Sequence, residues 1–160
     1  MSGLAVTTPT DTEIVMTRVF EAARARVFAA FTTPDLLKRW YGARGWHIVE
    51  CAVDLRPGGA WRFVWTGPDG AHMASGGVYR EVVAPRRLVL TEAFDDSWYP
   101  GDCLVTHLFA ERGAGTALTT TLTYPSRKVR DIALSYPMAR GVEEGYQRME
   151  EMFTQEGIPR

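Results

Sequence analysis

Hydrophobic and polar residues alternate with a period of two over most of the middle of the chain, which is typical of β-strands that bury one face. The alternation is broken by turn sequences rich in proline and glycine, such as "PGG" at residues 57–59 and "GPDG" at residues 67–70. With an alternating segment near the N-terminus, the pattern predicts seven strands, at residues 13–22, 46–56, 60–66, 72–83, 87–95, 102–111 and 116–124. Tight turns join several of them, so we expect an antiparallel sheet.

Two regions change to the spacing of amphipathic helices. Residues 24–42 follow the first strand and predict two short helices, divided by an N-cap threonine and an N1 proline at Thr33-Pro34. After the last strand, residues 127–134 predict a short helix and residues 137–154 a long one with an apolar stripe along one side.

This order of elements predicts an α+β fold in a single domain. A long antiparallel sheet with one long amphipathic helix must bury one face against that helix. A strongly twisted sheet curls around such a helix and leaves room for a cavity between them. Because 160 residues fit one domain, we assign residues 12–156 to it and expect residues 1–11, which are polar and small, to form a flexible arm.

The charge and the apolar content exclude several classes of partner. The chain carries 18 basic and 19 acidic side chains, so we expect neither nucleic acid nor a membrane surface as a partner. No apolar stretch approaches the ~20 residues that span a bilayer, and the N-terminal "MSGLAVTTPTDTE" has no signal-peptide pattern. We therefore expect a cytoplasmic protein; whether it forms a homodimer stays open.

The sequence offers no recognisable metal or cofactor motif. Cys51 and Cys103 form no CxxC pair, and His47, His72 and His107 are too scattered to suggest a ligand set. The glycine pairs lead into strands and not into a helix, unlike phosphate-binding loops. We expect no cofactor and no metal.

Aromatic and small residues point to the space between sheet and helix. Trp61, Phe63 and Trp65 share one face of a strand, where they are either ordinary core or the lining of a pocket. Gly141 and Gly145 lie four residues apart on the long helix, and each costs about 1 kcal/mol relative to alanine. Their presence indicates either a cavity or a close approach of the helix to the sheet.

Two polar side chains are expected to point inward. His107 alternates with apolar residues and is either a satisfied core histidine, a general acid or base, or a ligand anchor. Glu92 shares its face with Leu88, Leu90 and Phe94, so it either pairs with an arginine or serves a site. Trp98 lies in a loop at one end of the expected cavity, as an entrance gate or as a loop anchor.

Several motifs follow one another in an order that resembles a known family: "TTPDLLKRWYG", "VDLRPGGAWRF", "GPDG", "GGVYREVVAPRRLVLTEAFDDSW", "TALTTTLTYPS", "RDIAL" and "GVEEGYQRMEEMF". They are similar to the branch of the SRPBCC (START-like, Bet v-like) superfamily named after the activator of the heat-shock-protein-90 ATPase. The resemblance covers residues 12–155. It implies a helix-grip fold, with a curved seven-stranded antiparallel sheet, two short helices after the first strand and a long C-terminal helix. Residues 136–140 ("YPMAR") depart from the Ser-Gly-Met and acidic residues usual there.

The resemblance and the patterns together imply a binding protein for a small hydrophobic or amphipathic molecule, with no assigned reaction. A cyclase, hydratase or isomerase acting on a polyketide-like substrate is the alternative, with His107 and Glu92 as the weak catalytic candidates. A stimulator of a chaperone ATPase is the third, disfavoured because the chain lacks a separate chaperone-binding domain. The expected ligand contacts are Trp40, Trp61, Phe63, Trp65, Glu92, Phe94, Trp98, His107, Met138, Val142 and Tyr146.

Overall fold

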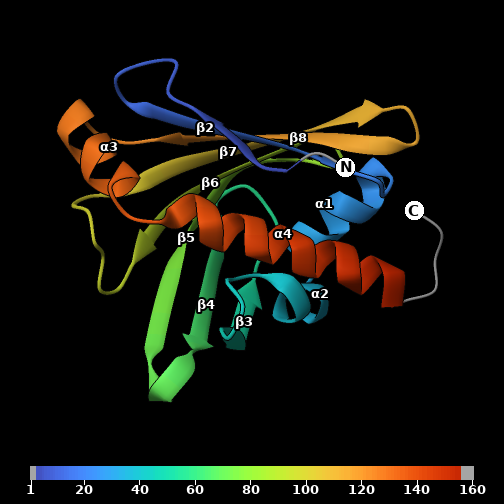
Figure 1. Cartoon of the computed structure of the whole chain (residues 1–160), viewed down its shortest axis with the longest axis horizontal. Helices are drawn as coiled ribbons and strands as arrows, with labels where there is room; N and C mark the ends of the chain where they lie inside the picture. Colours follow the sequence, from blue (N-terminus) through green and yellow to red (C-terminus); the bar gives the residue numbers. More distant parts are fainter. Residues whose placement is uncertain (1–2, 156–160) are drawn as a thin grey trace.

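The computed structural model describes residues 3–155, which form one antiparallel sheet and four α-helices (Figure 1). The helices are α1 (Arg24–Thr32), α2 (Pro34–Trp40), α3 (Arg127–Leu134) and α4 (Met138–Gln155). The strands are β1 (Ala5–Thr7), β2 (Glu13–Phe20), β3 (His47–Val53), β4 (Ala60–Thr66), β5 (His72–Val83), β6 (Arg87–Phe94), β7 (Cys103–Arg112) and β8 (Gly115–Thr123). Their order across the sheet is β1-β2-β8-β7-β6-β5-β4-β3. Among these residues, no helix is long and apolar enough to cross a membrane.

The number of strands differs from the prediction. The described residues contain eight strands instead of seven, because Ala5–Thr7 of the expected flexible arm forms β1 and pairs antiparallel with β2 at the edge of the sheet. Three residues are too few to show a period of two, and an edge strand with exposed side chains has no apolar face to reveal it. Residues 1 and 2 of the expected arm and residue 156 of the expected domain lie outside the described residues.

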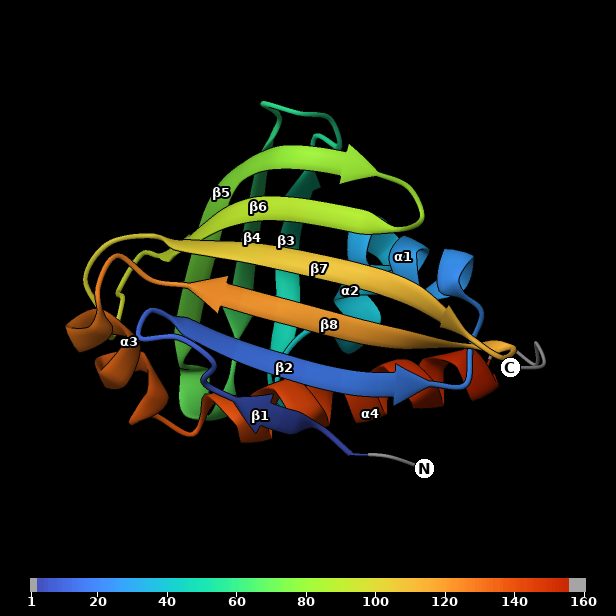
Figure 2. The same ribbon diagram turned by 90° about the horizontal axis from the view of Figure 1, so that it is seen from above.

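The sheet bends around α4. Figures 1 and 2 show the long strands β2, β8, β7 and β6 arching over one side of the helix, while β3, β4 and the lower part of β5 descend beside it. Helices α1 and α2 lie at the end of the concave face near the C-terminal part of α4, and α3 lies at the other end. The apolar stripe of α4 faces the sheet, so that Met149, Met152 and Phe153 are buried in the core.

Polar contacts fix α4 on both of its flanks. On one side, buried Arg18 of β2 pairs with Glu143 at 2.8 Å and with Glu150 at 3.5 Å. On the other side, Nη1 of Arg148 donates to the carbonyl oxygens of Gly42 at 3.0 Å and Trp46 at 3.1 Å, in the loop between α2 and β3. These contacts hold the middle of α4, between Glu143 and Glu150, across the concave face of the sheet.

Candidate functional site: a cavity between the sheet and helix α4

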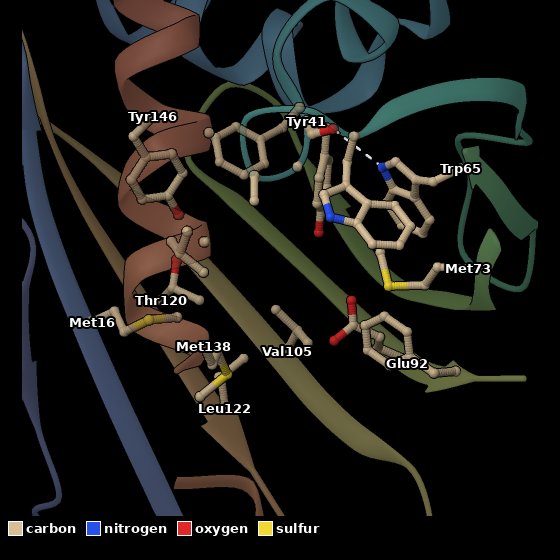
Figure 3. A pocket seen from close by; sticks show the side chains of 18 of the residues that line it. Met16, Tyr41, Trp65, Met73, Glu92, Val105, Thr120, Leu122, Met138 and Tyr146 are labelled. Carbon is tan, nitrogen blue, oxygen red and sulfur yellow. Dashed lines mark hydrogen bonds between the residues drawn. The ribbon is translucent and has the colours of Figure 1, made fainter. Parts of the chain in front are cut away.

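A cavity of about 340 Å³ lies between the concave face of the sheet and the first turns of α4. Its wall is formed by side chains of β2, β4–β8, α1 and α2, the loops at residues 41–46 and 95–102, and the N-terminal half of α4. Figure 3 shows Met16, Val105, Leu122 and Met138 on one side of this space and Trp65, Met73 and Tyr41 on the other. The cavity is therefore lined mainly by aromatic and aliphatic groups.

Most of the residues expected from the sequence contribute to this wall. Nine of the eleven line the cavity: Trp40, Trp65, Glu92, Phe94, Trp98, His107, Met138, Val142 and Tyr146. Trp61 and Phe63 do not, although both are buried.

Trp61 and Phe63 belong to the core behind the cavity. Nε1 of Trp61 donates a hydrogen bond of 3.0 Å to the carbonyl oxygen of Thr91. The ring of Tyr41 packs against Phe63, with 5.4 Å between the ring centroids, and Tyr41 itself lines the cavity. The alternation on β4 identified the correct face of the strand, but Tyr41 covers part of it.

The two inward glycines of α4 have different surroundings. A Cβ on Gly145 would lie 3.3 Å from the carbonyl oxygen of Gly42 and 3.4 Å from that of Trp40, so Gly145 permits a close approach of two backbones. A Cβ on Gly141 would meet only the Cβ of Ala43, at 3.7 Å. Both line the cavity, but only at Gly141 is there room for a larger side chain.

His107 is part of a neutral hydrogen-bonded chain. Its Nδ1 lies 2.8 Å from Oγ1 of Thr120, which also hydrogen-bonds to the hydroxyl of Tyr146. Burial against apolar groups, including Phe31 at 4.8 Å between ring centroids, lowers the pKa of His107 to about 3. The imidazole is therefore uncharged at neutral pH, which suits a hydrogen-bonding role and not a proton donor.

Glu92 is the only acidic side chain that lines the cavity, among the residues described. Within residues 3–155 it has neither an ion pair nor a hydrogen bond, so the expected pairing with an arginine is absent. Burial raises its pKa to about 7. Figure 3 shows its carboxyl group pointing into the cavity beside Met73. An unpaired carboxylate in an apolar wall destabilises the fold, which favours a role in a site.

The backbone positions of Glu92 and His107 are well separated along the sheet. In the sheet register, Glu92 lies opposite Cys103 and His107 lies opposite Leu88. The two positions are thus four residues apart along the strands, or about 13 Å. Glu92 is therefore separated along the cavity wall from the hydrogen-bonded group of His107, Thr120 and Tyr146.

The loop between β6 and β7 closes one end of the cavity with aromatic rings. Trp98 is half-buried and packs on Phe94, with 4.5 Å between the ring centroids, and it approaches Tyr136 at 6.0 Å. Its indole nitrogen is buried without a hydrogen-bond partner among the described residues. Tyr99 is buried and packs edge-on against Tyr124 at 5.2 Å. Trp98 and Tyr99 thus pack against neighbouring rings and line the cavity, and the role of this loop as an entrance gate stays a prediction.

Sequence reasoning missed several lining residues. Tyr41 and Trp46 belong to the loop after α2, where no period shows which way a side chain points. Met73 and Thr120 lie on strands, at positions that the alternation could have identified as inward-facing. Met16 was placed by alternation on a strand, but no signal distinguished a cavity wall from the core.

A curved antiparallel sheet that wraps a long C-terminal helix defines the class of helix-grip (Bet v1/SRPBCC) proteins. Within this class, the chain belongs to the family described as "Activator of Hsp90 ATPase homolog 1-like protein", whose model matches residues 21–154. The family resemblance inferred from the motifs is therefore confirmed. Comparison with curated proteins gives no match.

Solved structures share the fold over almost the whole chain. A protein from Rhodobacter sphaeroides is 31% identical, covers 96% of this chain and 99% of its own, and superposes with a TM-score of 0.91. A protein from Nitrosomonas europaea, 23% identical, covers 94% of this chain and 99% of its own, with a TM-score of 0.83. An AHSA1-like protein from Aeromonas hydrophila, 21% identical, covers 89% and 94% with a TM-score of 0.66. The last two show a common fold only.

Proposed function

We propose that this protein binds a small hydrophobic or amphipathic molecule in the cavity between the sheet and α4. The observation that carries the proposal is the cavity itself, about 340 Å³ in volume and walled mainly by apolar side chains. Small-molecule sites have volumes of roughly 300–1,000 Å³ and combine an apolar lining with a few polar groups. An apolar ligand gains about 25 cal/mol for each Å² that it removes from water.

The positions of the polar groups favour binding over catalysis. A cyclase or isomerase would need an acid and a base within hydrogen-bond reach of one reacting centre. Glu92 and His107 lie four residues apart along the sheet, and the pKa of His107 is lowered to about 3. The two groups instead suit the two ends of an elongated ligand.

Filling the cavity from α4 tests the proposal. We expect Gly141→Leu to weaken binding of the neutral fluorescent probe N-phenylnaphthylamine at least about tenfold, because the added side chain occupies the space that the ligand needs. Leucine also has the higher helix propensity, by about 0.8 kcal/mol, so the free energy of unfolding should not fall. Probe fluorescence and urea unfolding measure the two effects.

Gly141→Ala is the matched control, since it adds one methyl group where the structure has room and should leave probe binding close to wild type. Unchanged binding in a folded Gly141→Leu variant would contradict the position of the ligand. Failure of the wild-type protein to bind the probe at all would contradict the proposal as a whole.

A further inference from the structure

The ionisable charge on the cavity wall is of one sign, negative. Glu92 is the only acidic side chain among the lining residues described, and neither lysine nor arginine is among them. An anionic ligand would therefore find no counter-ion in the cavity, while its charge would lie in the same apolar space as the carboxyl group of Glu92. A cationic ligand would supply the partner that Glu92 lacks in residues 3–155.

Aromatic rings surround the end of the cavity where Glu92 lies. Phe94, Trp98, Tyr99 and Tyr124 line this end together with Glu92. The faces of aromatic rings attract cations, and the attraction is stronger in a site that excludes water. A carboxylate combined with aromatic rings is a suitable environment for an ammonium group whose apolar part fills the rest of the cavity.

We infer that the ligand is an amphipathic amine, whose protonated amino group lies against the carboxylate of Glu92 and whose apolar body occupies the space between the sheet and α4. This inference rests on the proposed function and specifies the chemical class of its ligand. The order of affinity it requires is amine, then the alcohol of the same shape, then the carboxylic acid.

Affinity for an amine should rise with pH. The titratable groups nearest Glu92 come from the loop after α2, from the loop between β6 and β7, from β7 and from the residue after β8: Tyr41, Tyr99, Cys103 and Tyr124. Burial raises the pKa of each, so all four are neutral at physiological pH. His107 and, on α4, Tyr146 are neutral as well. Ionisation near pH 7 in this cavity therefore belongs to Glu92.

The test compares naphthylmethylamine, naphthylmethanol and naphthoic acid as competitors of N-phenylnaphthylamine. At about pH 8 the amine should bind at least about tenfold more tightly than the alcohol, because its ammonium group donates a charge-assisted hydrogen bond to the ionised carboxylate of Glu92. Naphthoic acid should bind most weakly. Since the amine is protonated throughout, its affinity should fall about 30-fold between about pH 8 and about pH 5.5, as Glu92 takes up a proton.

Glu92→Gln keeps the shape of the side chain and removes its charge, so it should abolish both the preference for the amine and its pH dependence. Glu50→Gln is the control, because it removes the same charge from an exposed position on β3 outside the cavity. It should behave as the wild type does.

The outcomes separate this inference from the proposed function. If the wild type binds N-phenylnaphthylamine but takes the alcohol or the acid as well as the amine, the amine inference is wrong and the binding function stands. Retention of the preference in a folded Glu92→Gln variant would also overturn the inference. Absence of binding by the neutral probe would remove the basis of both.

Discussion

Glu92→Gln is expected to gain stability relative to the wild-type protein as the pH rises. The pKa of Glu92 is raised from 4.5 to about 7 in the folded protein, so between these values the unfolded chain has lost a proton that the folded chain still holds. Stability falls with rising pH wherever the unfolded state binds fewer protons. This difference in pKa between the unfolded and folded states lowers the free energy of unfolding by about 3 kcal/mol at pH values above 7.

Urea unfolding of the ligand-free protein from about pH 4 to about pH 8 measures this effect. Across that range, the free energy of unfolding of Glu92→Gln should rise by about 3 kcal/mol relative to that of the wild type. Its absolute stability at any one pH also includes the burial of the new amide, so the change with pH is the decisive quantity. Glu50→Gln should show the wild-type profile, and parallel profiles for Glu92→Gln and wild type would refute the prediction.

The loss of stability that we expect from ionisation of Glu92 is informative about function. A half-buried carboxylate whose ionisation weakens the fold is not explained by folding, because glutamine at the same position would avoid the ionisation. Sites that destabilise a protein are commonly places where a ligand completes the interactions. An ammonium group bound at Glu92 would turn the same carboxylate into a stabilising partner, so stability above pH 7 should increase most on amine binding.

The regular part of the fold could be predicted from the sequence because its signals are local. Alternation and turn residues identified β2 to β8, and helical spacing identified α1, α2, α3 and α4 close to their observed bounds. β1 was missed because it has three residues with exposed side chains at the edge of the sheet. Its position depends on pairing with β2, for which the sequence contains no local signal.

The sequence predicted which face of each strand points inward, but not which residues of that face line the cavity. Alternation places Trp61, Phe63 and Trp65 on one side of β4, but only Trp65 reaches the cavity, because Tyr41 covers Phe63. Tyr41 lies in a loop whose path is set by tertiary contacts, including those of Arg148 with the carbonyl groups of that loop.

The same limit applies to the glycines and to Glu92. Gly141 and Gly145 are identical in sequence terms, yet one borders open space and the other touches backbone. Whether Glu92 pairs with an arginine depends on which arginines fold toward it, and within residues 3–155 no arginine pairs with Glu92. Arg62, for example, pairs with Asp95 at 2.6 Å on the exposed side of the sheet.

His107→Gln is expected to have the opposite effect on stability. The pKa of His107 is lowered from 6.5 to about 3 by burial, so below pH 6.5 the unfolded chain takes up a proton that the folded chain refuses. On account of this residue, the stability of the wild type should therefore fall by about 2 kcal/mol as the pH drops from about 6.5 to about 4.5. Glutamine keeps a group that hydrogen-bonds to Thr120 and does not titrate.

The two titrations overlap between pH 4.5 and pH 6.5, where Glu92 lowers stability with rising pH and His107 raises it. Their slopes are equal and opposite for one proton each, so these residues together leave the wild-type profile flat in this range. Each single variant should expose the slope of the other residue, and the double variant should be flat again. Because the two sites are about 13 Å apart, their effects should add. If the stability of both single variants did not change with pH in this range, then neither Glu92 nor His107 would have the shifted pKa on which the prediction depends.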